Sequence, residues 1–248
     1  MIDYDPRIVD LYDGDNPDGP DHDYNRSLAD RTDARAVLDV GCGTGILTVT
    51  FAQPDRTVVG VDPSPAMLAH ARRRSGAGNV TWIEGDSGAI PGGGFDLIVM
   101  TGNVAQHIPD PAWERTLTDV RRHAHDDATL AFESRNPAAR VWTAWEQPEP
   151  TVRDTPQGPL REWCEVWELD RGRVLKRAHT RFESTGEQVV EELELAFRDH
   201  DDLAGQLVRA GFEVTAVWGN WNRTPFDGTQ PIMVFEARAA AGRRIENG

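Results

Sequence analysis

Short apolar runs alternate with amphipathic segments through the first half of the chain. Each run holds four to seven residues rich in Val, Leu and Ile, which predicts five buried strands, at 36–40, 57–61, 80–83, 95–100 and 128–134. Helix signals lie between them: Ser64–Pro65 is typical of a helix start, and Trp113, Leu117 and Val120 share one helical face. Strands that alternate with helices predict an α/β fold with a Rossmann-like, doubly wound sheet.

The pattern changes after the fifth run. Residues 135–160 are rich in proline, and three segments with strand character follow, separated by turn residues. In the last segment Val189, Leu193 and Leu195 share one parity, which predicts a half-buried strand of an antiparallel meander. A helix from about Asp201 and two final strands complete the expected order.

These patterns predict four parts: an N-terminal helical segment or lid (1–35), a cofactor-binding α/β core (36–134), an antiparallel β insertion on the substrate side before the last helix (135–200), and a closing helix with a β-hairpin (201–240). The run Asp13–Asp23 is rich in Asp, Gly and Pro, which predicts a loop. A helix is expected directly after the glycine cluster that ends the first strand.

Charge narrows the function classes. The 248 residues hold 26 Lys and Arg against 41 Asp and Glu, a formal net charge of −15, and Lys176 is the single lysine. Nucleic-acid binding depends on clustered basic residues, so neither a nucleic acid nor an anionic membrane surface is an expected partner. The acidic N-terminus lacks the apolar core of a secretion signal, which favours the cytoplasm. Cys42 and Cys164 lie far apart, and no spacing predicts a metal site.

The clearest motif follows the first strand, where Gly41, Gly43 and Gly45 form a Gly-x-Gly-x-Gly turn. Glycine permits a left-handed backbone and lets a ligand approach closely. The spacing differs from the Gly-x-Gly-x-x-Gly of dinucleotide-binding folds. Asp39, two residues before the turn, suits a ligand with an amine and a positive centre better than it suits a pyrophosphate.

Further acids stand at the ends of the next two strands. Asp62 lies 21 residues after Gly41, where a carboxylate can accept hydrogen bonds from both ribose hydroxyls. Met67 begins the following helix and is expected against a purine face. Asp86 follows the third strand and is placed to accept a hydrogen bond from an adenine amino group.

In this order and spacing, VLDVGCGTG, VGVDPSPAML, EGDSGAIP and FDLIVMTGNVAQHI resemble the motifs of class I S-adenosylmethionine-dependent methyltransferases. The resemblance is strong over residues 34–134, and the rest is similar to glycine and sugar N-methyltransferase-like members that act on small molecules. It implies S-adenosyl-L-methionine as cofactor and S-adenosyl-L-homocysteine as product. It also implies cofactor contacts from Gly41, Gly43, Gly45, Asp62, Met67, Asp86, Ser87, Thr101 and Asn103.

Acceptor-side residues are expected beyond the fourth and fifth strands. His107 is the candidate general base, with packing as the alternative role. Arg135 is a candidate for binding a carboxylate or phosphate, with a surface ion pair as the alternative. Tyr24 is expected to fold over the cofactor as part of the lid. Three aromatic residues are candidates for acceptor contacts, with core packing as the alternative: Trp142, Trp218 and Trp221.

The sequence thus predicts an enzyme that moves a methyl group to a nitrogen or oxygen of a small molecule, such as an amino acid, a sugar or a natural-product intermediate. TGNVAQ after the fourth strand is unlike the Asn/Asp-Pro-Pro-aromatic motif of amino-methylating DNA enzymes. Methylation of carbon, a non-methylating enzyme on the same cofactor fold, and a cofactor-sensing binding protein remain alternatives. A homodimer is left open.

Overall fold

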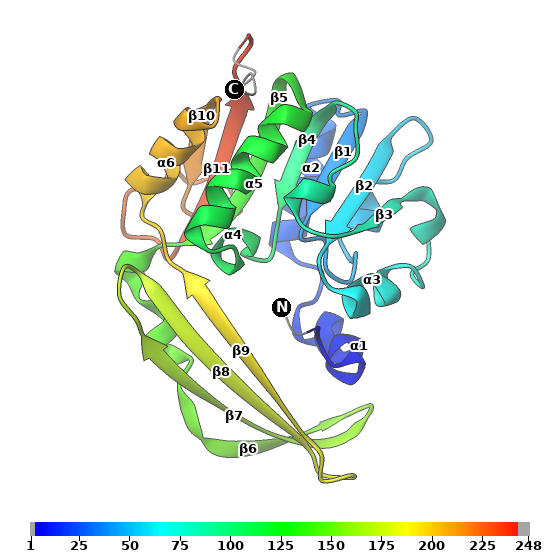
Figure 1. Ribbon diagram of the computed structural model, residues 1–248, viewed down its shortest axis with the longest axis vertical. Coiled ribbons are helices and arrows are strands. Elements are labelled where there is room, and N and C mark those ends of the chain that lie inside the picture. The colour runs from blue at the N-terminus through cyan, green and yellow to red at the C-terminus, as the bar shows by residue number, and fades with distance from the viewer. Residues whose placement is uncertain (1–2, 243–248) are drawn as a thin grey trace.

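The chain forms two separate β-sheets (Figure 1). The computed structural model describes residues 3–242. The seven-stranded sheet contains β1 (Ala36–Val40), β2 (Thr57–Asp62), β3 (Thr81–Glu84), β4 (Phe95–Met100), β5 (Ala124–Arg135), β10 (Phe212–Trp218) and β11 (Ile232–Ala239). The four-stranded sheet contains β6 (Gln147–Thr155), β7 (Gly158–Glu168), β8 (Arg173–Phe182) and β9 (Gln188–Ala196). The α-helices are α1 (Pro6–Asp15), α2 (Pro20–Arg31), α3 (Pro65–Ala71), α4 (Val104–His107), α5 (Asp110–His123) and α6 (His200–Arg209).

The larger sheet has the strand order β10-β11-β5-β4-β1-β2-β3. Strands β1 to β5 pair in parallel, while β11 runs antiparallel to both β5 and β10. The order reverses at β1, which has β2 on one side and β4 on the other. Ligands of doubly wound sheets bind at the carboxyl ends of the strands beside such a reversal. The predicted Rossmann-like sheet with an antiparallel insertion is confirmed.

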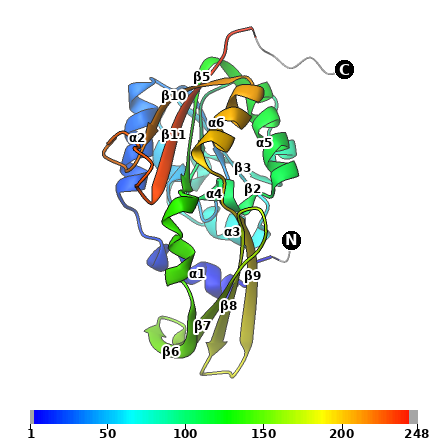
Figure 2. The same ribbon diagram turned by 90° about the vertical axis from the view of Figure 1, so that its left-hand side faces the viewer.

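Side chains of the parallel strands alternate between two apolar layers. Leu38 and Ile98 belong to the layer that contains Trp113 of α5, and Val37 and Leu97 to the layer that contains helix α2. Figure 2 shows α2 on one face of the sheet and α5 with α6 on the other. Because both faces are covered, these strands read as continuous apolar runs rather than as alternating patterns.

The insertion has one strand more than the three predicted. Strand β6 lies in the proline-rich stretch, where Pro148 and Pro150 argue against a central strand. It pairs only with β7, and the register shifts between Gln147 and Thr151. An edge strand needs hydrogen bonds on one side only, so the prolines are tolerated there.

Two local predictions near the N-terminus are wrong. The run Asp13–Asp23 is not one loop, since α1 extends to Asp15 and α2 begins at Pro20, in the position where proline favours a helix start. The α-helix expected after the glycine turn is a single 3-10 turn, Thr48–Phe51. Tertiary packing overrides local propensity in segments this short.

Helix α1 connects the two sheets. Leu11 packs on Leu160 and Phe182 of the four-stranded sheet, and Asp13 accepts a hydrogen bond of 2.6 Å from the hydroxyl of Thr44 in the glycine turn. Figure 1 shows α1 beside α3, across from the four-stranded sheet. The N-terminal segment therefore covers the carboxyl edge of the larger sheet. Over residues 3–242, no helix is long and apolar enough to cross a membrane.

Candidate functional site

The three glycines of the turn have different surroundings. All have positive φ: +75° at Gly41, +53° at Gly43 and +72° at Gly45. A Cβ at Gly41 would lie 2.5 Å from Val104, and one at Gly45 would lie 2.5 Å from Trp82, so protein packing requires both glycines. A Cβ at Gly43 would meet no atom within 4 Å. The open space at Gly43 is where a ligand can approach the backbone.

Two buried carboxylates flank this turn. Asp39 accepts a hydrogen bond of 2.7 Å from Thr48 through Oδ2, while its Oδ1 has no partner, and burial raises its pKa to about 7. Asp62 accepts 2.8 Å hydrogen bonds from the backbone N–H groups of Gly43 and Ser64, and burial raises its pKa as well. Asp62 therefore holds the turn in place while standing at the end of β2.

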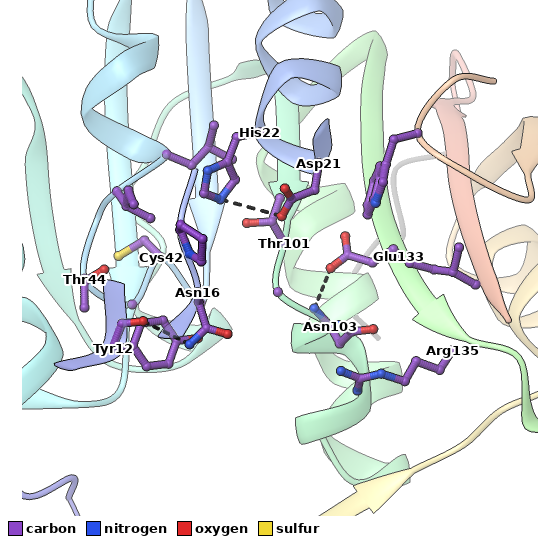
Figure 3. Close-up of a pocket in the computed structure, with 18 of the residues that line it drawn as sticks. Tyr12, Asn16, Asp21, His22, Cys42, Thr44, Thr101, Asn103, Glu133 and Arg135 are labelled. Atoms are coloured by element: carbon purple, nitrogen blue, oxygen red, sulfur yellow. Dashed lines mark hydrogen bonds and ion pairs between the residues drawn. The ribbon is translucent and has the colours of Figure 1, made fainter. Parts of the chain in front are cut away.

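A cavity of about 480 Å³ opens at the carboxyl ends of β1, β4 and β5. The glycine turn and Asp39 form one end of it, and residues after β4 and β5 form the other. Helices α1 and α2 contribute Tyr12, Asp21 and His22 to its wall (Figure 3). Together with Trp221, Pro231 and Ile232 near the end of the chain, these segments make five regions that meet where the strand order reverses.

Glu133 is the main polar group at the far end of the cavity. It is 2% exposed, and its Oε1 accepts a hydrogen bond from the backbone N–H of Asn103, whereas Oε2 has no partner. Burial raises its pKa to about 7, and the charge of Asp21 acts in the same direction. Figure 3 shows its carboxylate turned toward the space beside Thr101 and Asp21.

Arg135, two residues further along β5, lines the same cavity. Its Nη1 donates a hydrogen bond of 3.0 Å to Oε1 of Gln106, and its guanidinium lies 5.0 Å from the ring centre of Trp145. Desolvation lowers its pKa. His107 ends α4 outside the lining of this cavity. His107 is an exposed residue, yet desolvation by surrounding protein atoms and the charges of Arg135 and Lys176 lower its pKa.

The structure brings together six of the predicted site residues around the cavity: Gly41, Gly43, Thr101, Asn103, Arg135 and Trp221. Three predicted residues do not line the cavity: Gly45 at the end of the turn, Asp62, which accepts a hydrogen bond from Gly43, and Met67 in α3. Asp86 lies beyond β3, where it forms an ion pair with Arg115. The hydroxyl of Ser87 donates a hydrogen bond of 2.8 Å to Asp119.

Three predicted aromatic contacts are used in packing instead. The Tyr24 hydroxyl donates a hydrogen bond of 2.7 Å to Glu236, and the Trp218 indole N–H donates to the same carboxylate. Trp142 is buried with its ring 4.4 Å from that of Phe197. None of the three lines the cavity. Residue type alone could not reveal that these rings pack in apolar clusters.

Several lining residues were not among the predicted site residues. Asp21 and His22 lie in the run that reads as a loop, and Trp145 lies in the proline-rich stretch. Glu133 stands near the end of a long apolar strand, and an acid in such a buried position is a signal that sequence can carry. No local sequence pattern indicates that Asp21, His22 or Trp145 belongs to the site.

Comparisons with known proteins find similarity to methyltransferases. Residues 37–127 match a methyltransferase domain model. Glycine N-methyltransferase of Mus musculus is 33% identical over 117 residues, 40% of this chain and 40% of that protein. A ubiquinone biosynthesis O-methyltransferase of Hahella chejuensis is 31% identical over 164 residues, 58% of this chain and 64% of that protein. The matched part of the chain thus spans about two fifths to two thirds of these relatives.

The fold agrees over a longer stretch. The structure of CalS10 with bound S-adenosylmethionine, an amino pentose methyltransferase from Micromonospora echinaspora, superposes with a TM-score of 0.68. The alignment covers 97% of this chain and 99% of that one at 20% sequence identity. The likeness therefore includes the insertion and the closing hairpin as well as the core.

Proposed function

Because the chain belongs to the class I S-adenosylmethionine-dependent methyltransferases, we propose that it transfers a methyl group from S-adenosylmethionine to a nitrogen or oxygen of a small molecule. The observation that carries this proposal is the cavity itself. It joins the open side of Gly43 to a second polar region around Glu133 and Arg135. A donor bound at one end and an acceptor bound at the other would meet inside one cavity.

The residues at the turn fit the proposed cofactor. Gly43 leaves room for close approach, and the free oxygen of Asp39 can accept a hydrogen bond from an amino group. Asp62 would bind the ribose while keeping its bonds to the turn. S-adenosylmethionine supplies a methyl group activated by a positively charged sulfur, and the carboxylates of this site favour a cation.

The adenine is proposed to lie between α3 and the end of β3, against Met67 and near Asp86. The Asp86 carboxylate also bonds the backbone N–H of Gly88, which holds it at this strand end. Ser87 would contribute its backbone, because its hydroxyl is bonded to Asp119. This part of the proposal follows the family resemblance and the chain order of the motifs.

The protein's contribution is alignment and the exclusion of water, which account for much of the rate in such displacements. Helix α1 and the start of α2 cover the cavity from the N-terminal side. At the acceptor end, Arg135 would bind an anionic group, and Trp145 and Trp221 would form flat apolar walls. His107 is placed outside this cavity, so the proposed acceptor contacts do not include it.

The test is a thermal-shift titration with S-adenosylmethionine, S-adenosylhomocysteine and NAD in parallel. Stabilisation by a ligand of the native state grows with concentration, by about 2.7 kcal/mol at a hundredfold excess over Kd. A saturable rise with both sulfur compounds and none with NAD is expected. A rise in melting temperature with NAD alone, or no rise with any of the three compounds, would contradict the proposal. Incubation with a methyl-labelled cofactor and mixed small molecules then reports whether label is transferred.

A further inference from the structure

Two buried hydrogen-bond acceptors at the acceptor end of the cavity lack donors. Glu133 Oε2 is buried without a partner, and so is Oδ1 of Asn103. Asp21 adds a second carboxylate to the same wall. A buried acceptor left without a donor destabilises the protein. A ligand that brings several hydrogens on one atom would remove that cost at more than one position.

We propose that the acceptor is a primary or secondary amine, and that Glu133 takes a proton from its nitrogen. Asn103 and Asp21 would bind the N–H groups that remain, two in a primary amine and one in a secondary amine. This inference rests on the proposed function and names the substrate class and a catalytic residue for it. An alcohol brings one hydrogen on its reacting oxygen, whereas a primary ammonium brings three. The acceptor oxygens around the cavity therefore match nitrogen better than oxygen.

The position of Glu133 suits a base. One oxygen is fixed by the Asn103 backbone N–H, which leaves the other free and oriented. Arg135 is on the same strand, but its guanidinium donates to Gln106 and does not pair with this carboxylate. The pKa of about 7 that burial produces allows the group to take a proton near neutral pH and to release it again.

The step balances without another reactant. The ammonium passes one proton to the Glu133 carboxylate and becomes a neutral amine. Loss of the proton leaves the nitrogen lone pair facing Glu133, so the neutral amine turns until the lone pair faces the sulfonium methyl. The N–C bond then forms as the C–S bond breaks, with that electron pair left on sulfur. The product is a methylated ammonium and a thioether, and Glu133 returns its proton to solvent.

The first experiment measures acceptor binding rather than turnover. Protein loaded with S-adenosylhomocysteine is titrated with matched pairs: glycine and glycolate, sarcosine and methoxyacetate, and an amino sugar with its parent sugar. We expect at least one amine to bind tenfold more tightly than its oxygen counterpart. Glu133→Gln should weaken that binding at least tenfold. The control, Glu114→Gln, alters an exposed carboxylate on α5 and should bind as the wild type does.

The outcomes separate the two proposals. If the wild type does not bind S-adenosylhomocysteine, the proposed function fails. If it binds this compound but shows no preference for any amine, or if Glu133→Gln binds amines as well as wild type, the inference fails alone. Circular dichroism and thermal unfolding of Glu133→Gln show whether the variant is folded. Glu133→Asp, which keeps the carboxylate, should recover part of the amine binding if the variant with Gln is unstable.

The pH profile distinguishes a base from a merely structural acid. With the amine found above, wild-type kcat/KM should rise with pH and level off near pH 7. In Glu133→Gln it should fall about 100-fold at pH 7. It should then rise tenfold per pH unit up to the pKa of the free amine, because only neutral amine from solution can react. A profile in Glu133→Gln that keeps the wild-type shape would overturn the role of Glu133.

Asn103 provides an independent check. Its backbone is left-handed, with φ of +61°, so Asn103→Gly is compatible with the conformation and keeps the N–H that holds Glu133. This variant should bind the amine less tightly while the pH at which kcat/KM levels off stays unchanged. A shift of that pH would mean that the Asn103 side chain, not only its backbone, sets the proton affinity of Glu133.

Discussion

At the residue scale, glycine has two different uses within five positions. Gly41 and Gly45 make room for Val104 and Trp82, and their requirement comes from the protein itself. Gly43 has the same left-handed backbone but faces open space. The sequence motif does not distinguish the three glycines, whereas the structure shows that only the middle one has open space where a Cβ would stand.

Alanine substitutions should separate these uses. A residue with a Cβ is less stable in a left-handed backbone by about 1–2 kcal/mol. We expect the free energy of unfolding of each variant to fall by this amount. Gly41→Ala should lose more, because its Cβ would clash with Val104. Gly43→Ala should lose only the stability that the left-handed backbone costs, yet bind S-adenosylhomocysteine at least tenfold more weakly. Urea unfolding and calorimetry measure the two quantities, and unchanged affinity in Gly43→Ala would remove Gly43 from the site.

At the scale of elements, α1 links the cofactor side to the four-stranded sheet. Asp15 accepts hydrogen bonds of 2.8 Å from both Nη atoms of Arg153 in β6, and Asp13 binds Thr44 in the glycine turn. Leu11 adds an apolar contact with β7 and β8. Exposed ion pairs contribute little individually, so the apolar contact should decide how firmly α1 is held.

Leu11→Ala tests this attachment. Truncation of a buried leucine typically costs about 2–5 kcal/mol. Because α1 is a peripheral helix, we expect the loss as local opening, with faster amide hydrogen exchange in residues 6–15 and little change in β4 or β5. Val152→Ala, at an exposed position of β6, is the matched control and should exchange as the wild type does. Equal exchange in Leu11→Ala and the control would show that polar contacts hold α1.

At the scale of the whole molecule, the buried acids make stability depend on pH. Burial raises the pKa values of Asp39 and Glu133 to about 7, above those of the same groups in an unfolded chain. The native state therefore holds more protons than the unfolded state between these pKa values. The contribution of these two groups to the free energy of unfolding is therefore largest below about pH 4, and it is lost as the pH rises through about 7. His107, with a lowered pKa, acts in the opposite direction below about pH 6.5.

We therefore expect the free energy of unfolding of the free protein to fall between pH 6.5 and 8.5. Glu133→Gln should show a shallower fall, since an amide at this position has no proton to lose. Urea unfolding at several pH values measures both slopes. A stability that is constant over this range in both proteins would show that the two acids ionise as they do in water.

Sequence alone was sufficient for the core and the cofactor. Strands that are buried on both faces are continuous apolar runs, which the sequence displays directly. The glycine turn, Asp39 and Asp62 stand at or beside the ends of these strands, so their order along the chain also places them in the fold. The predicted Rossmann-like fold is confirmed. The sequence predicted two other regions less accurately. Strand β6 contains prolines, and α1 ends and α2 begins within a run of turn residues.

Only the tertiary structure decided which side chains share the cavity. Asp21, Glu133 and Trp145 come from three separate segments, and no local periodicity relates them. It also assigned Tyr24 and Trp142 to apolar clusters, although their types suit a binding site equally well. The physical reason is that backbone conformation and burial of a strand are set mainly by neighbouring residues. An acceptor site, in contrast, depends on contacts between distant segments that form only when the chain has folded.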